Sequence, residues 1–485
     1  MLRCLLVFVI TLWIGFFSYA QKPENKIELG KLFSSSYERM LVDARGSRGG
    51  NGDVAAAYLT ISDFLINYQI QSDIIILVDE NAKTRFLNLA VGNREVLNKV
   101  KILTLDEIPK NKFFDFYMVL ANPSGSYRYK ADFEEKIKFS KDATYIVQTV
   151  LGNTENTSSI HPYATVEHDG LKVDWSPAGM AFNEAGIYSD YIAQKLVLMQ
   201  DRQEVLSFIH QHLNEIQDAE SFKKIEYVLF SEVFKKSQVG LVYGISAEQT
   251  QKQFEKYLQG LVNTSFDRSY TLITPSSFDI NKLSDVNLKK HIVHIKKMSD
   301  MPKDVQSGRV YIVETKTLPH SVFVSLMALS HKNKMTPVGA GDGFLSAAIE
   351  LGIPFVLTRV PWNAANIQNL KDMLYKLILS SSKVPSGEVA SFKLLLEENY
   401  ERLDFRRAND LYRYTPIYKA LSRGVKRLSN SLMKMSLNAK DMRSPEKLNF
   451  DDHIFQHNYM KKYREQIQAI ESKQKMMSCV NLFAS

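Results

Sequence analysis

The sequence contains few of the residues that build disulfide or metal frameworks. Its 485 residues include two cysteines, and one of these, Cys4, lies in an N-terminal apolar stretch, far from Cys479. This excludes a disulfide-stapled fold and a cysteine-based metal site. The histidines lack the spacing of metal ligands, so each is expected to be a core or surface residue. This expectation applies to His161, His168, His320 and His331.

A uniformly basic character is also absent. The formal net charge is +8, but residues 383–485 carry 19 Lys and Arg against 12 Asp and Glu, which accounts for +7 of it. The remainder of the chain is close to neutral, which argues against a nucleic-acid-binding protein. The basic charge lies on two expected amphipathic helices, 418–440 and 459–475. They either pack back on the core or contact an anionic membrane surface.

Long apolar runs are missing except at the N-terminus. Arg3 is followed by an apolar run and then by Ser18-Tyr19-Ala20, a small-x-small pattern typical of a cleaved signal peptide over residues 1–20. The alternative is a membrane anchor, because the run approaches the length that spans a bilayer. We therefore expect an exported or secreted protein, or else an anchored one.

The chain is too long for one ordinary core and fits two domains with additions. After a short polar linker to Ser36, strand-like and helical segments alternate, which is typical of parallel sheets covered by helices. A mainly helical stretch, 184–233, separates two such groups. The expected strands are 40–44, 73–81, 99–105, 115–123 and 143–151, and then 238–246, 269–275, 291–296 and 308–314.

These patterns predict an α/β fold with two Rossmann-like parallel-sheet domains and a helical, basic C-terminal extension. The expected boundaries are 1–20 for the leader, 36–235 for the first domain with its helical linker, 236–382 for the second, and 383–485 for the extension.

A glycine-rich loop opens the first domain between a strand and a helix. It contains Gly49-Gly50-Asn51-Gly52-Asp53 and is flanked by Arg45 and Arg48. Glycines allow a ligand to approach the backbone closely, and the following helix presents unpaired N–H groups. The alternatives are a tight turn with Asp53 as a helix cap, and arginines that are simply solvated.

A second such loop, Gly339-Ala340-Gly341-Asp342-Gly343, precedes an expected helix over 343–351 and the apolar run IPFVL. This arrangement suits a diphosphate at a helix N-terminus. A carboxylate would repel phosphate, so Asp342 is expected to bind ribose hydroxyls or loop amides instead. The alternative is again capping and tight packing.

The stretch SLMALSHKNKMTPVGAGDGFLSAAIELGIPFVL resembles the donor half of GT-B-fold glycosyltransferases. RGGNGDVAAAYLTISDFL likewise resembles the acceptor-side opening of that fold, and both loops are remotely similar to those of protein-arginine rhamnosyltransferases. The resemblance covers the organisation of residues 36–380. The sequence departs from the pattern at His331, where an acid is common.

The resemblance implies a glycosyltransferase that uses a nucleotide-sugar donor without a metal or a bound cofactor. Asp53 would be the general base, and Glu350 would be the acid that binds donor ribose in many members. The implied donor-binding residues are Gly339, Gly341, Asp342, Gly343, Ser346 and Glu350. Those on the acceptor or phosphate side are Arg45, Arg48, Gly50, Asn51 and Gly52.

Further loops are candidates for contacts with the substrate. Asn183, Glu184 and Gly186 either touch sugar or form a packing turn, and Trp362 and Asn363 either contact a base or sugar or only pack.

Two other functional classes remain open: a non-catalytic protein that binds nucleotides or sugars, and a sugar-nucleotide epimerase of the same fold. A leader also conflicts with activated sugars made in the cytoplasm, so the compartment, the acceptor and the donor base stay undetermined by the sequence.

Overall fold

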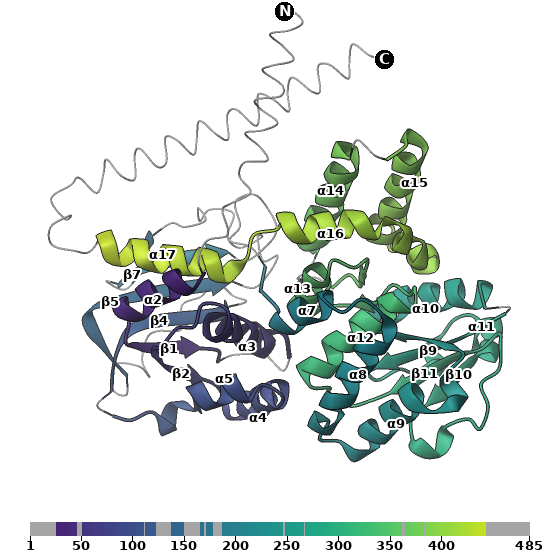
Figure 1. Ribbon diagram of the computed structural model, residues 1–485, viewed down its shortest axis with the longest axis horizontal. Helices are drawn as coiled ribbons and strands as arrows, with labels where there is room; N and C mark the ends of the chain where they lie inside the picture. Colours follow the sequence, from purple (N-terminus) through teal and green to yellow (C-terminus); the bar gives the residue numbers. More distant parts are fainter. Residues whose placement is uncertain are drawn as a thin grey trace, which may run out of the picture. The chain divides into compact units, whose positions relative to one another are not determined.

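The computed structural model describes residues 26–45, 51–110, 112–122, 137–149, 165–168, 171–177, 187–245, 248–265, 267–360, 364–381 and 384–442. It forms two compact units, 1–435 and 436–485, and both sheets belong to the first unit. Within it, strands and helices alternate in two successive groups (Figure 1). The expected α/β fold with two parallel sheets is confirmed.

The first group is built around a seven-stranded sheet with the order β3-β2-β1-β4-β5-β7-β6. All neighbouring strands in it are parallel except β6 and β7. Its elements are α2 (Lys26–Ser36), β1 (Arg39–Asp43), α3 (Asn51–Ile66), β2 (Asp73–Leu77), α4 (Glu80–Ala90), α5 (Arg94–Lys99), β3 (Val100–Leu103), η1 (Leu105–Glu107), β4 (Phe113–Asn122), β5 (Lys138–Thr149), β6 (Thr165–His168) and β7 (Leu171–Pro177).

Burial explains why these segments are strands. In β1 and β2 the last four residues of each strand are buried, as expected for a parallel strand covered on both faces. Leu41, Ile75 and Phe114 belong to one cluster of buried side chains on this sheet.

Two expectations for the first group were wrong. The polar linker before Ser36 is largely the helix α2, because Phe33 is fully buried and packs edge-on against Phe116, 5.2 Å between ring centroids. The segment 171–177, where no strand was expected, forms strand β7, which pairs with β5.

The second group contains a four-stranded parallel sheet with the order β10-β11-β9-β8 and the parallel pair β12-β13. A parallel bridge between Val242 and Val338 joins them, so β12 follows β8. Its elements are β8 (Ser237–Leu241), α10 (Glu248–Asn263), β9 (Ser269–Thr274), η4 (Ile280–Lys282), α11 (Val286–His291), β10 (Ile292–Ile295), η5 (Met298–Asp300), β11 (Val310–Glu314), α12 (His320–Lys332), β12 (Val338–Gly339), α13 (Asp342–Leu351), β13 (Val356–Leu357) and α14 (Ala364–Ser380).

Helices connect the two groups, as the sequence predicts for 184–233. They are α7 (Tyr191–Val197), α8 (Arg202–His212), η2 (Leu213–Glu215), α9 (Ala219–Phe230) and η3 (Glu232–Phe234). Aspartates cap the starts of α7, α8 and α9, and their carboxylates accept backbone N–H bonds there.

The described part of the chain after residue 383, which ends at Met442, is mainly helical, as expected. It contains α15 (Ser386–Leu396), η7 (Glu397–Glu401), η8 (Phe405–Tyr414), α16 (Thr415–Gly424) and α17 (Leu428–Met442). The single helix expected over 418–440 is instead two, because Ile187 pairs with the chain between them. Its N–H donates to the carbonyl of Lys426, and its carbonyl accepts from the N–H of Leu428. The expected helix 459–475 and the leader lie outside the described residues.

Candidate functional site

A cavity of about 70 Å³ lies where four parallel strands of the second group end. Tyr243 follows β8, Pro275 follows β9, Thr317 follows β11, and Gly341 follows β12. The strands β9 and β12 lie on opposite sides of β8, so the chain changes direction in the sheet between β8 and β12. In open α/β sheets ligands bind at such a switch point, outside the carboxyl ends of the strands.

Two helices begin at this cavity. Gly341 adopts φ +90°, a conformation that favours glycine, and α13 starts immediately after it at Asp342. A Cβ placed on Gly343 would lie 3.6 Å from the Cβ of Ala55, and both residues line the cavity. Ala55 stands in the second turn of α3, whereas α12 begins at His320, which also lines the cavity. The positive ends of the α12 and α13 dipoles therefore lie at this cavity.

Two other glycines permit the close approach of the loops around this cavity. A Cβ on Gly339 would lie 2.4 Å from the ring of Phe344, and one on Gly244 would lie 2.9 Å from the Cβ of Ala340. Gly244 also adopts φ +72°. Gly339 therefore serves packing in this structure, whereas Gly341 and Gly343 line the cavity itself.

A buried histidine and aspartate connect the cavity to α7. His320, the first residue of α12, lines the cavity, and its Nε2 lies 2.8 Å from Oδ2 of Asp190. The side chain of Asp190 is fully buried, and its other oxygen accepts the N–H groups of Ile192 and Ala193. A carboxylate only accepts hydrogen bonds, so Nε2 carries a proton and donates it, and in the neutral tautomer with this arrangement Nδ1 is the acceptor.

Asp342, Ser346 and Glu350 follow one face of α13 at intervals of four residues. Asp342 lines the cavity, and Ser346 is fully buried with an Oγ that has no hydrogen-bond partner among the described residues. Glu350 lies two turns further, about 12 Å along the helix. The structure therefore brings Asp342 to the cavity and places Glu350 away from it.

Glu350 takes part in a network that joins three segments. Its carboxylate lies 2.7 Å from Nε of Arg427 and accepts a 2.9 Å hydrogen bond from Gln194 of α7. Burial raises the pKa of Glu350, and this effect outweighs the opposing one of Arg427. These contacts make Glu350 a link between α13, α7 and the segment between α16 and α17.

The glycine loop of the first group is only partly described. The helix α3 begins at Asn51, so Asn51, Gly52 and Asp53 form its first turn, and Asp53 lies inside the helix rather than at the cap position considered above. Arg48 and Gly50 lie outside the described residues. Arg45 forms an ion pair with Asp43, with Nη2 2.8 Å from Oδ2, and Tyr117 donates to the same carboxylate. The role of Asp53 as a base stays a prediction, although α3 brings its segment beside α13.

The other candidates do not enlarge this site. Gly186, Asn183, Glu184, Trp362 and Asn363 lie outside the described residues. No group of three or more His, Cys, Asp or Glu residues in the described ranges has a geometry that would hold a metal ion. No described helix is both long and apolar enough to cross a membrane.

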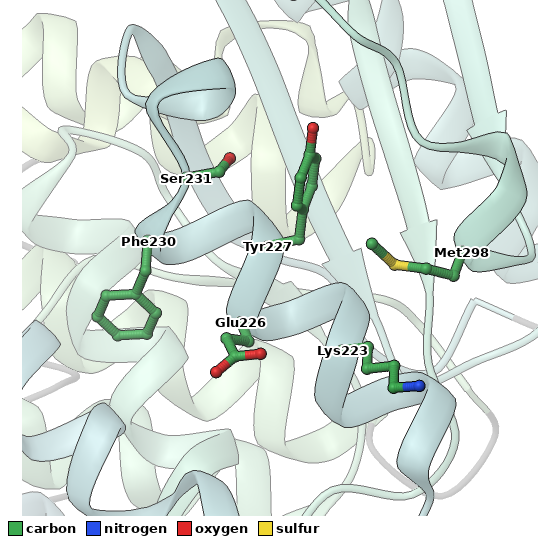
Figure 2. A pocket seen from close by; sticks show the side chains of 6 residues that line it. All are labelled: Lys223, Glu226, Tyr227, Phe230, Ser231 and Met298. Carbon is green, nitrogen blue, oxygen red and sulfur yellow. The ribbon is translucent and has the colours of Figure 1, made fainter.

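A larger hollow, about 330 Å³, lies between α9 and η5 and contains none of the expected site residues. In Figure 2 the side chain of Met298 extends toward Tyr227 of α9. Lys224 of the same helix donates hydrogen bonds to the carbonyls of Lys296 and Glu314 at the ends of β10 and β11. The hollow therefore belongs to the β10 edge of the sheet, away from the switch point.

Sequence reasoning missed His320, Asp190 and Gly244 as parts of the site. His320 was judged a core or surface residue because no partner stands near it in the sequence, and its partner Asp190 is 130 residues away. A usable signal was its position at the start of a helix that follows a strand, since that places it at the carboxyl end of the sheet.

Comparisons with known proteins give only remote similarity. No family model and no curated protein matches the chain. Among solved structures, a UDP-GlcNAc 2-epimerase from Neisseria meningitidis bound to UDP-GlcNAc is 13% identical, with a TM-score of 0.33, and the match covers 78% of this chain and 99% of that one. A ugt transferase from Siraitia grosvenorii in complex with UDP is 9% identical, with a TM-score of 0.35 and coverage of 83% and 99%.

A third structure is the trehalose 6-phosphate synthase from Burkholderia multivorans, at 12% identity and a TM-score of 0.31, with coverage of 82% and 76%. The resemblance of this chain to GT-B glycosyltransferases is thus remote.

Proposed function

We propose that the protein is a glycosyltransferase that moves a sugar from a nucleotide-sugar donor to an acceptor. The observation that carries the proposal is the cavity at the switch point, where α12 and α13 both begin. Two helix N-termini favour a ligand with concentrated negative charge, and a diphosphate has that charge.

The cavity defines the part of the donor that it would hold. A volume of about 70 Å³ is a fraction of the roughly 300–1,000 Å³ of a complete small-molecule site. It suits the phosphate end of the donor, over the first turn of α13. Asp342 at its edge would then accept hydrogen bonds from ribose hydroxyls or loop amides, in line with the sequence-based expectation.

The transfer itself needs a proton acceptor. An acceptor hydroxyl or nitrogen would attack the anomeric carbon, the bond from that carbon to the phosphate oxygen would break, and the nucleoside diphosphate would leave with the electron pair. Helix dipoles and amides at the first turns of α13 and α12 would stabilise the charge on the leaving group. The proton would pass to Asp53 or to Nδ1 of His320, which Asp190 holds in place.

The proposal is tested by incubating the protein with nucleotide sugars labelled in the sugar and by analysing the products. Release of nucleoside diphosphate together with a labelled glycoside, or with free sugar in the absence of an acceptor, supports the transferase. A labelled nucleotide sugar with altered stereochemistry identifies an epimerase. Binding of the nucleotide sugar without turnover identifies a non-catalytic binding protein, and an absence of binding contradicts the proposal.

A further inference from the structure

A second cavity, of about 280 Å³, lies at the opposite end of α13. Its lining comes from the ends of α7, α12 and α13 and from one face of α16, all within the first compact unit. The helix α13 has 10 residues, so its two ends are about 15 Å apart. This cavity is therefore separate from the one at the switch point.

Positive charge gathers on one side of this second cavity. Lys419 and Arg423 lie one turn apart on the same face of α16, and both are exposed. No ion pair or hydrogen bond joins either side chain to another described residue. Like charges at this spacing repel each other, so the pair costs stability unless a negatively charged group binds between them.

Two more residues that line this cavity, Lys332 and His331, bring side-chain nitrogen atoms to it. Lys332 lines it and is held by the carbonyls of Met199 and Gln200, at 2.9 and 2.8 Å. His331 also lines it, and its buried Nδ1 has no hydrogen-bond partner among the described residues. A buried polar atom without a partner costs free energy, which a ligand atom would recover. Glu350, the acid of this cavity, is already paired with Arg427.

The lining also has an apolar part. Leu196 and Ile353 are buried there, whereas Val197 is 51% exposed and the adjacent Leu198 is 80% exposed. Two exposed aliphatic side chains beside a basic rim are typical of a surface that contacts an amphiphile.

We propose that this second cavity binds a phosphate-bearing amphiphile, with the phosphate between Lys419 and Arg423 and the apolar portion against Val197 and Leu198. The phosphate belongs either to a lipid headgroup or to a free phosphate ester, and the chemistry of recognition is the same for both. The site goes beyond the proposed transfer reaction and does not depend on it.

The test uses the full chain and two probes. Inorganic phosphate binding is followed by thermal shift, and co-sedimentation is measured with phosphatidylcholine vesicles that contain or lack 30 mol% phosphatidylglycerol. In the double variant Lys419→Gln/Arg423→Gln, binding of both probes is expected to weaken at least about tenfold, because charge-assisted hydrogen bonds to phosphate are lost. The control Lys236→Gln/Lys303→Gln removes two exposed charges elsewhere and is expected to bind like the parent.

Leu198→Ser separates the two sources of the phosphate. If the ligand is a lipid, vesicle binding falls in this variant while the inorganic phosphate shift persists. If the ligand is a soluble ester, the vesicles never bind and the phosphate shift alone responds to Lys419→Gln/Arg423→Gln. Equal behaviour of this double variant and the control with both probes overturns the proposal.

Discussion

His331 provides a direct test of the electrostatics at the second cavity. Burial, and then the charges of Lys332 and Lys419, lower its pKa from 6.5 to about 4. The folded protein therefore holds this ring neutral, while the unfolded chain protonates it near pH 6.5. With the folded pKa lowered, the unfolded state binds more protons between pH 6.5 and 4, so stability falls as the pH is lowered through that window.

The magnitude follows from the two pKa values. At pH 7.5 the contribution is close to zero, and at pH 5 the shift destabilises the folded state by about 2 kcal/mol, at 1.36 kcal/mol for each pKa unit. Replacing the imidazole with a group that does not titrate removes this loss. In His331→Gln the free energy of unfolding should therefore fall by about 2 kcal/mol less than in the parent between pH 7.5 and 5.

The assay is urea denaturation of both proteins at pH 7.5, 6.5 and 5.0. The variant Lys419→Gln serves as a second probe, because removal of the neighbouring charge should raise the pKa of His331 and reduce the loss at pH 5. A parent and a His331→Gln variant with parallel pH profiles would refute the reasoning, since the ring would then be free to protonate in the folded state.

Three further predictions follow from named contacts. Gly339→Ala should lower the free energy of unfolding by about 1–3 kcal/mol in urea denaturation, because its Cβ would overlap the ring of Phe344; an unchanged midpoint contradicts this. Arg427→Met removes the partner of the buried carboxylate of Glu350 and should lower the free energy of unfolding by about 3–5 kcal/mol in the same assay. Adding Glu350→Gln to this variant should restore part of that free energy, and no recovery would show that the ion pair is not the cause. Asp190→Asn should keep the melting temperature within a few degrees but reduce the rate of sugar transfer at least about tenfold, because an amide can hold the ring of His320 in the wrong orientation. Full activity of this variant would argue against His320 as the proton acceptor.

Local periodicity was enough to predict the two parallel sheets. The run SYTLIT is buried along its length, and DIIIL is buried after its first residue; they appear as β9 and β2, close to where the pattern places them. Prediction from local periodicity failed where a residue far away in the sequence determines the structure. The expected helix 418–440 is interrupted because Ile187 pairs with Lys426 and Leu428. No local sequence pattern near either segment predicts that pairing.

The candidate site was likewise predicted only where local sequence signals determine it. The loop around Gly341 and the start of α13 could be read from glycine and helix signals, and both lie at the cavity. The resemblance to GT-B glycosyltransferases also put Glu350 with them, but in the structure Glu350 lies two helical turns away from Asp342. The ion pair with Arg427 and the bond between His320 and Asp190 join residues far apart in sequence, so no local signal contains them.

The most direct test of the central claim is the binding of nucleoside diphosphates to Gly343→Asp and Gly343→Asn, measured by titration calorimetry. An acid in the first turn is compatible with the helix dipole of α13, and the added Cβ makes only an ordinary contact with Ala55, so both variants should fold. The account predicts that the carboxylate weakens diphosphate binding at least about tenfold more than the isosteric amide, because it repels a phosphate placed there. Equal affinities for the two variants would place the diphosphate elsewhere and contradict the account.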